Sequence, residues 1–318
     1  GKYAAKASFR IAEALISGEE YDLAEDILNM KEIRQNEGLG PSTASIIKEA
    51  EARNIPWIRL NRYSLCQLGY GANQKRIQAT VTSQTSNIGV DIACDKEETK
   101  LLLEQAEVPI PKGDIIRTER GLEEAAEHVG FPLVIKPVNG NHGRGITTNI
   151  NSMDEALIAF KEAKEISRLV IVEKYITGED YRLLVIDNKL VAAAKRTPAH
   201  VIGDGKSSIQ QLVDEVNKDE RRGYGHEKVL TEISINSLTI ELLKENGMTP
   251  ETIVPKGEFV KLKSTANLST GGTAEDVTDL IHPYNIFMAE RISKIIGLDI
   301  CGIDIMAHDL TKPLNESG

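Results

Sequence analysis

The chain has 318 residues, enough to bury the core of one large domain or of two smaller ones. It is 41% hydrophobic and 27% charged, and no apolar run approaches the ~18 residues of a membrane span, so we expect no integral membrane protein and no membrane partner. With 38 basic and 48 acidic residues the formal net charge is −10, which argues against a broad surface for nucleic acid and requires any anionic ligand to be held by a local basic cluster.

The cysteines and the chain ends bear on localisation. Cys66, Cys94 and Cys301 form neither a CxxC pair nor a metal-ligand spacing. An odd, sparse set of this kind is typical of a reducing compartment, so we expect a cytoplasmic protein. The first residues are charged throughout and lack the apolar core of a signal peptide. They also lack an initiator methionine, and KPLNESG ends the chain without a capping element, so we expect part of a longer protein.

The N-terminal part of the chain is predicted to be a small unit of its own. Residues 10–54 show the apolar spacing of amphipathic helices, and IPWIRLN is predicted to be a strand. Between two helical stretches, EGLGPSTAS has the Gly-Pro-Ser-Thr order of a loop that ends in a helix cap. Ser42 or Thr43 is therefore expected to cap the next helix.

From about residue 96 the chain alternates helices and strands. Helices are predicted over DKEETKLLLEQAEV, LEEAAEHV, MDEALIAFKEAKE, SIQQLVDEVNKDERR, LTIELLKENG and NIFMAERISKIIG. Strands are predicted over PLVIK, GITTNI, LVIVEKYI and DICGIDIMAHD, and DYRLLVIDNKLVAAAKRTP has the two apolar runs and the short polar turn of an antiparallel hairpin. The pattern favours an α+β fold of two lobes over a single parallel sheet.

The stretch VIKPVNGNHGRGI places basic residues and glycines directly after a predicted strand. Gly140, Gly143 and Gly145 would let backbone N–H groups surround an anion, and Lys136 adds a positive charge. The stretch is neither a Walker A loop, GxxxxGKS/T, nor a GxGxxG turn. A basic hairpin with solvated His142 is an equally good interpretation of these residues alone.

Two further stretches bring charges to strand ends. In VEKYITGED, Glu179 and Asp180 follow a Gly turn and could accept hydrogen bonds from a nucleoside, although a solvated acidic turn is the simpler interpretation. In the predicted hairpin, Arg182 lies on one strand and Lys195 and Arg196 end the other. These basic groups either share one anionic site or are independent surface charges.

The last third of the chain contains a polar loop and an isolated acid. In STANLSTGGTA, Asn267, Ser269, Gly271 and their neighbours offer hydroxyls, an amide and free backbone N–H groups to a carboxylate or phosphate oxygen, unless the loop has no role. In CGIDIMAHD, Asp304 stands in an apolar strand, where burial would require a charged partner or a metal. Mg²⁺ prefers one or two carboxylates plus phosphate oxygens, so Asp304 would need a second ligand.

Taken in order, these motifs resemble the ATP-grasp superfamily of carboxylate–amine ligases and, within it, the cyanophycin synthetase family. The resemblance runs from about residue 80 to the end, and GLGPSTASII is similar to the end of the N-terminal domain of that family. Bifunctional glutathione synthetases share the stretches like GDGKSSI and NLSTGG. The motifs concerned are DKEETK, VIKPVNGNHGRGI, VEKYITGEDYRLLV, KRTPAHVIGDGKSSIQQLVDEVN, STANLSTGGTAEDVTD and CGIDIMAHDLTKP.

The resemblance implies an ATP-grasp fold of two α+β lobes with ATP between them. It assigns residues 89–318 to this domain, truncated at its C-terminal end, and residues 1–88 to the end of a smaller α/β N-terminal domain. The implied reaction uses ATP and Mg²⁺ to phosphorylate the C-terminal carboxylate of a cyanophycin primer, which then reacts with the amino group of L-aspartate. A Mur-ligase-like domain, absent here, would add L-arginine, and a homotetramer is expected. The alternatives are a ligase for another amino acid or peptide, as in glutathione synthetases, and a non-catalytic ATP-binding module.

The same resemblance implies roles for individual residues. For ATP it implies phosphate contacts by Lys96 and Lys136, a phosphate cover from Gly140 through Gly143 to Gly145, an adenine hinge of Glu173, Lys174, Tyr175 and Ile176, and a ribose contact by Glu179 or Asp180. For the reacting carboxylate or its acyl phosphate, it implies that His142 lies nearby and that Arg182 and Ser269 hold the group. It implies that Ser42 contacts aspartate. Further substrate contacts are implied for Arg196, Asn267 and Gly271. Asp304 is implied as a Mg²⁺ ligand, whose partners, a Glu-x-Asn pair, would lie beyond Gly318. Lys263 stands where arginine is expected.

Overall fold

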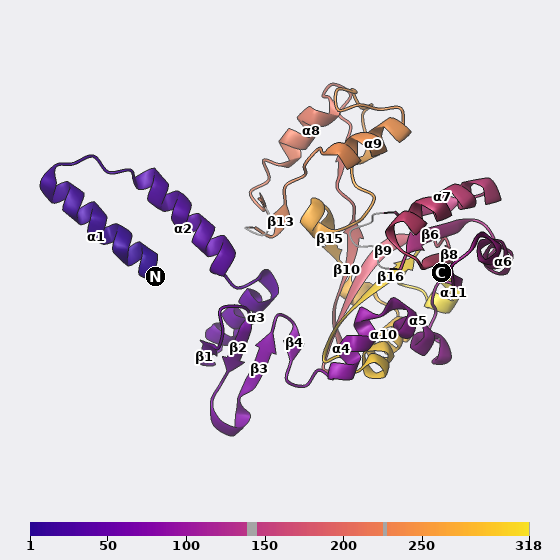
Figure 1. The fold of residues 1–318 in the computed structure, drawn as a ribbon, viewed down its shortest axis with the longest axis horizontal. Coiled ribbons are helices and arrows are strands. Elements are labelled where there is room, and N and C mark those ends of the chain that lie inside the picture. The colour runs from indigo at the N-terminus through magenta and orange to yellow at the C-terminus, as the bar shows by residue number, and fades with distance from the viewer. Residues whose placement is uncertain (139–144, 225–227, 318) are drawn as a thin grey trace. The chain divides into compact units, whose positions relative to one another are not determined.

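The structure, a computed structural model of the 318-residue chain, describes residues 1–138, 145–224 and 228–317 (Figure 1). The chain forms two compact units, Gly1–Gln84 and Thr85–Gly318. Each unit has hydrophobic clusters of its own. Among the described residues, no helix has the length and apolar character needed to cross a membrane.

The first unit consists of helices followed by a small antiparallel sheet with the strand order β1-β2-β3-β4. Its helices are α1 (Lys2–Ser17), α2 (Leu23–Glu37) and α3 (Pro41–Ala52), with a 3₁₀ turn η1 (Gly71–Asn73). Its strands are β1 (Trp57–Arg59), β2 (Leu65–Leu68), β3 (Lys75–Gln78) and β4 (Val81–Thr82). The core of this unit is formed by Ile47 of α3, Cys66 of β2 and Ile77 of β3.

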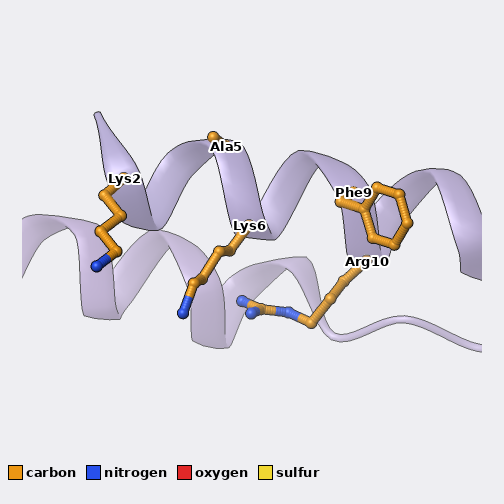
Figure 2. Close-up of a pocket in the computed structure, with 5 residues that line it drawn as sticks. All are labelled: Lys2, Ala5, Lys6, Phe9 and Arg10. Atoms are coloured by element: carbon orange, nitrogen blue, oxygen red, sulfur yellow. The ribbon is translucent and has the colours of Figure 1, made fainter.

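Helices α1 and α2 form an antiparallel hairpin (Figure 1) that is pinned by one acidic side chain. The carboxylate of Asp26 accepts hydrogen bonds from Tyr3 Oη at 2.6 Å, from Arg10 Nη2 at 2.5 Å and from the Tyr21 hydroxyl. The hydrogen bond from Tyr3, followed by that from Arg10, lowers the pKa of Asp26. Figure 2 shows Lys2, Lys6 and Arg10 projecting to the same side of α1, as a spacing of four residues requires.

Helix α3 begins earlier than the sequence predicts. Gly40 is the N-cap and Pro41 is the first helical residue, so Ser42 and Thr43 lie inside the helix. Proline suits the first helical position because its missing N–H would have no partner there and its φ is already helical. Thr43 is buried and its Oγ1 lies 3.4 Å from the carbonyl oxygen of Ala79. The prediction that Ser42 or Thr43 caps this helix is therefore wrong.

The second unit contains two four-stranded antiparallel sheets, and the first has the order β5-β8-β6-β7. Its strands are β5 (Gly113–Ile116), β6 (Leu133–Pro137), β7 (Thr147–Ile150) and β8 (Val170–Lys174). Helices α6 (Glu119–Val129) and α7 (Met153–Ile166) pack on one face of it through an alanine-rich, aliphatic core (Figure 1). Alternation along the strands leaves Lys136, Ile171 and Glu173 on the other face.

The second sheet has the order β15-β10-β9-β16. Its strands are β9 (Glu179–Ile186), β10 (Lys189–Thr197), β15 (Thr273–Asp276) and β16 (Ile300–Ala307). Asp187 and Asn188 connect β9 to β10 with positive φ angles of 50° and 58°, the backbone that a tight two-residue hairpin turn prefers, so the predicted hairpin is confirmed. Helix α10 (Pro283–Ile296) covers the apolar face of this sheet.

Between β10 and β15 the chain forms a smaller subdomain with its own core. It contains β11 (His200–Ile202), α8 (Ile209–Val216), β12 (Arg222–Gly223), β13 (Leu230–Thr231), α9 (Ser237–Glu245) and β14 (Phe259–Lys261). The remaining elements of the unit are α4 (Asn87–Cys94), α5 (Lys96–Gln105), η2 (Leu268–Thr270), η3 (Thr278–Leu280) and α11 (Leu314–Ser317). The mixture of helices and antiparallel sheets confirms the predicted α+β class.

Candidate functional site

A cavity of about 700 Å³ lies within the second unit. One wall comes from β5, β6 and β8 of the first sheet, another from β16 of the second sheet, and α5 and α10 close the rest. Most of its lining is aliphatic, and its ionisable lining residues are Lys96, Glu97, Lys100, Glu104, Asp114, Lys136, Glu173 and Asp304. Ligand sites are commonly of this kind: several hundred Å³, mostly apolar, with a few placed charges.

The carboxylate of Glu173 lies at the centre of the charged wall. Its Oε2 is 2.5 Å from Nζ of Lys136, and its Oε1 is 3.3 Å from Nζ of Lys100. Glu173 and Lys136 meet because Val134 of β6 is the direct partner of Glu173 of β8, which makes Lys136 its diagonal neighbour on the cavity face. The Glu173 side chain is only 12% exposed, so this carboxylate depends on its two ammonium partners.

Lys100 is a cavity residue that the sequence analysis did not identify. It lies one turn after Lys96 on α5, and both lysines line the cavity. The helix is fixed at its start by Asp95, whose Oδ1 accepts from the backbone N–H groups of Glu97 and Glu98 at 2.8 and 3.1 Å. The spacing of four between the two lysines was the available signal.

The predicted hinge, residues 173–176, spans the end of β8 and is split between two environments. Glu173 and Ile176 line the cavity, whereas Lys174 donates from Nζ to the carbonyl oxygens of Gly130 and Phe131 at 3.1 and 2.5 Å. The backbone N–H of Tyr175 donates to the carbonyl of Pro132 at 3.0 Å. Lys174 and Tyr175 therefore fix this segment to the loop before β6, while Glu173 and Ile176 face the cavity.

On the second sheet, four charged residues form a cluster on the face opposite α10. Strand pairing places Asp304 opposite Arg182 and Asp180 opposite Arg196. Asp304 Oδ1 lies 3.0 Å from Arg182 Nη1 and 2.9 Å from Arg196 Nη2. Arg196 also bonds Asp180 Oδ1 through Nε at 2.7 Å and Nη2 at 2.5 Å. The predicted grouping of basic residues thus exists for Arg182 and Arg196, and it includes two acids.

Gly302 makes room for one member of this cluster. A Cβ atom at Gly302 would lie 2.1 Å from Nη2 of Arg182, so the guanidinium of Arg182 occupies the space that a side chain would take. This explains the glycine in the strand motif CGID.

Asp304 is not buried, although it lies in an apolar strand. Its side chain is 60% exposed, and two arginines pair with it. The part of the chain that the structure describes contains no group of three or more His, Cys, Asp or Glu side chains suited to a metal ion. Asp304 lies at the cavity wall as a single carboxylate, so a Mg²⁺ ion there would need its other oxygens from phosphates.

The loop before β15 uses the backbone N–H groups of Thr270, Gly271 and Gly272 internally. The N–H groups of Thr270 and Gly272 donate to the carbonyl of Asn267 at 3.1 Å, and that of Gly271 donates to the carbonyl of Leu268 at 3.2 Å. The expectation of free N–H groups is therefore wrong at these positions, because the loop forms the 3₁₀ turn η2 and uses them itself. Asn267 and Ser269 are exposed.

This loop is held from two sides. A Cβ at Gly272 would lie 2.9 Å from the carbonyl oxygen of Thr197, so the loop packs tightly against the end of β10, next to Arg196. On the other side the carbonyl of Gly271 accepts from Nη1 of the buried Arg222 at 3.0 Å. Ser269 and Arg196 thus belong to neighbouring segments at one end of the second sheet.

Other predicted site residues lie as follows. Glu179 pairs with Lys195 at 3.2 Å. Gly145 precedes β7 with a φ of +67° and packs against Pro137 and Ile166. Ser42 is exposed on α3 of the first unit. His142, Gly140 and Gly143 lie outside the described residues.

Lys263, at the position where arginine is expected, is engaged with α9. Its Nζ donates to Asn236 Oδ1 at 2.9 Å and to Thr239 Oγ1 at 2.7 Å, and burial lowers the pKa of this ammonium group. Asn236 is the N-cap of α9. Lys263 therefore ties the segment before Asn267 to the subdomain.

Residues 93–211 match the RimK-like ATP-grasp domain. This part of the chain is therefore similar to ATP-grasp domains. It is 50% identical to the cyanophycin synthetase of Trichormus variabilis over 99% of this chain, and 51% identical to that of Geminocystis herdmanii over 99%. These matches confirm the resemblance to cyanophycin synthetases that the sequence analysis identifies. The chain spans little more than a third of these relatives, 36% and 37% of their lengths.

Similarity to glutathione-forming proteins is weaker. The bifunctional glutathione biosynthesis protein of Clostridium perfringens is 33% identical over 88% of this chain and is covered over 37% of its own length. Among solved structures, a bifunctional glutathione synthetase from Pasteurella multocida matches with a TM-score of 0.66 and 29% identity, over 87% of this chain and 38% of that one. This match supports the ATP-grasp fold.

Proposed function

We propose that the chain is the ATP-dependent ligase part of a cyanophycin synthetase, an enzyme that extends a primer with aspartate. The observation that carries this proposal is the 50% identity to cyanophycin synthetases over 99% of the chain, which covers both units. The corresponding figure for the glutathione relative is 33% over 88%. A ligase for another amino acid is therefore the second candidate.

The cavity supports ATP as the phosphoryl donor. Its volume of about 700 Å³ and its aliphatic walls suit a nucleotide base, and Ile176 and Glu173 line it at the hinge. Lys96 and Lys136 would hold the phosphates, and Glu179 or Asp180 the ribose. Both acids already pair with basic residues, Lys195 and Arg196, so a ribose hydroxyl would share their oxygens. Asp304 would hold Mg²⁺, which would neutralise charge on the phosphates.

The proposed reaction has two steps. The C-terminal carboxylate of the primer attacks the γ-phosphorus of ATP, forming an acyl phosphate and releasing ADP. The amino group of aspartate then attacks the acyl carbon, phosphate leaves, and the amine loses a proton as the amide forms. No covalent enzyme intermediate is needed, so the residues act by positioning two anions and by offsetting their repulsion.

The polar cluster on the second sheet suits the acyl side of this reaction. Arg182 and Arg196 bring two cations to one face, where they pair with Asp304 and Asp180 and could exchange these partners for a substrate anion. Ser269 and Asn267 present neutral donors at the same end of the sheet. We assign to them the primer carboxylate and the acyl phosphate, with Gly271 shaping the loop. His142 would lie near the reacting carboxylate, and Ser42 would contact aspartate.

The complete polypeptide would have a second catalytic domain, a second amino-acid substrate and a defined oligomeric state. A second domain would add L-arginine to the side-chain carboxylate of each new aspartate, and the enzyme would act in the cytoplasm as a homotetramer.

Measuring ADP release from the complete polypeptide tests the proposal. With ATP, Mg²⁺ and a cyanophycin primer, we expect ADP to form when aspartate is supplied and not with glycine or cysteine. ADP formation from γ-glutamylcysteine and glycine, without a response to aspartate, would favour the second candidate. No aspartate-dependent ADP with an active primer would contradict the proposal.

A further inference from the structure

The proposed nucleotide site contains a lysine, Lys100, to which the reaction above gives no role. It lines the cavity from α5, one turn after Lys96. Its Nζ lies 3.3 Å from one oxygen of Glu173, whose other oxygen lies 2.5 Å from Lys136. One carboxylate is therefore shared by two ammonium groups from different elements.

The charges of this trio matter because little of it faces solvent. The side chains of Glu173, Lys100 and Lys136 are 12%, 23% and 26% exposed. Two ammonium groups and one carboxylate leave a net charge of about +1 at neutral pH. If one of the two lysines were removed, the trio would lose its excess positive charge and the carboxylate would keep one partner.

Binding of a triphosphate changes this balance. In the proposed complex Lys136 turns its ammonium toward the phosphates, and Glu173 loses the closer of its two partners. If Lys100 were absent, Glu173 would then be a mostly buried carboxylate with no partner, and its negative charge would repel the phosphates and oppose binding. Lys100 already contacts the other carboxylate oxygen, Oε1, and would remain as a partner of Glu173.

Resting on the proposed use of ATP, we propose that Lys100 is a positioning residue that neutralises Glu173 when the nucleotide draws Lys136 to its phosphates. Lys100 acts through Glu173 and does not itself contact the phosphates. It thereby frees Lys136 for the nucleotide and sets the affinity for ATP.

The expected effect falls on binding more than on the chemical step. Lys100→Met should raise the KM for ATP and the Kd of the analogue AMP-PNP roughly tenfold, equivalent to ~1.4 kcal/mol. The kcat should change much less, because the same triphosphate is bound in the ground state and in the transition state. Lys100→Arg should recover most of the affinity, since it restores a charge that can bond the carboxylate.

A double-mutant cycle tests whether Lys100 acts through Glu173. The Kd of AMP-PNP with Mg²⁺ is measured by calorimetry on the complete polypeptide, for the wild type, Lys100→Met, Glu173→Gln and the double variant. We expect Lys100→Met to weaken binding in the wild type and to have no further effect beside Gln at 173, where no charge needs neutralising. An equal loss in both backgrounds would show direct contact with the nucleotide and overturn the proposal.

Two controls separate this role from a purely structural one. Lys161 lies on α7, is 69% exposed and does not line the cavity, so Lys161→Met should leave the Kd unchanged. Thermal unfolding is followed for every variant. A lower Tm for Lys100→Met with an unchanged Kd would assign Lys100 to stability alone and overturn the proposal.

This readout is independent of the amino-acid substrate. A wild-type protein that binds AMP-PNP and shows the cycle, but releases no ADP with aspartate, would contradict the proposed function and support the role of Lys100. A wild-type protein that binds no AMP-PNP would contradict both.

Discussion

Arg196 and Arg182 share the carboxylate of Asp304, yet they should differ in what they contribute to stability. The Arg196 side chain is 16% exposed and also bonds Asp180, which is 28% exposed. The Arg182 side chain is 45% exposed and pairs with Asp304, which is 60% exposed. Breaking a buried ion pair costs ~3–5 kcal/mol, and partial exposure of both acids should reduce the loss for Arg196→Met to ~1–2 kcal/mol. For Arg182→Met the loss should stay below ~1 kcal/mol.

Urea denaturation of the two variants measures this difference. We expect a clearly lower free energy of unfolding for Arg196→Met, with partial recovery when Asp180→Asn removes the carboxylate that has lost its partner. Turnover should fall by about tenfold or more in both single variants, since each loses a cation from the proposed binding site for the primer carboxylate and the acyl phosphate. Equal stability losses, or a larger loss for Arg182→Met, would show that burial does not decide what each arginine contributes.

Three further predictions concern the phosphate site, the second sheet and a loop of the subdomain. Lys136→Ala should abolish ADP release while circular dichroism shows the fold retained, and wild-type rates would remove the phosphate assignment. Gly302→Ala should displace the Arg182 guanidinium, because the added Cβ would lie 2.1 Å from its Nη2. We expect turnover to fall about tenfold and the free energy of unfolding to fall by under ~1 kcal/mol, because a flexible side-chain end can move. Turnover equal to wild type would contradict this. Hydrogen bonds from the backbone N–H groups of Ser207 and Lys206 lower the pKa of Asp204 to about 2. The ionised carboxylate therefore stabilises the folded protein fully above the unfolded pKa of ~3.9, and this stabilisation is lost as pH falls through about 2. The Tm difference between wild type and Asp204→Ala should accordingly shrink from pH 5 to pH 2, and a constant difference would contradict it.

The elements with a strong local pattern were predictable from the sequence. The hairpin of β9 and β10 follows from two apolar runs around Asp187 and Asn188, residues that tolerate the positive φ of a tight turn. The strand predicted over LVIVEKYI is confirmed as β8, Val170–Lys174, and Glu173 lies on its cavity face.

Two features that depend on distant segments, and one ambiguous loop, were not predictable. Strand β5 is four residues long, with only Ile115 and Ile116 as apolar residues, and it is defined by its pairing with β8. The approach of Lys100 to Glu173 joins residues that are 73 positions apart in the chain. The closure of the loop before β15 on its own carbonyls was hidden because a Ser/Thr/Gly stretch is equally compatible with free and with internally bonded N–H groups.

Incorporation of isotope-labelled aspartate into the primer shows directly whether the enzyme is an aspartate ligase. The complete polypeptide is incubated with ATP, Mg²⁺, a cyanophycin primer and labelled aspartate, and the primer is then analysed by mass spectrometry. We expect one labelled aspartyl residue in amide linkage at the primer C-terminus for each ADP released. ADP release without labelled primer, or equal incorporation of glycine, would contradict it.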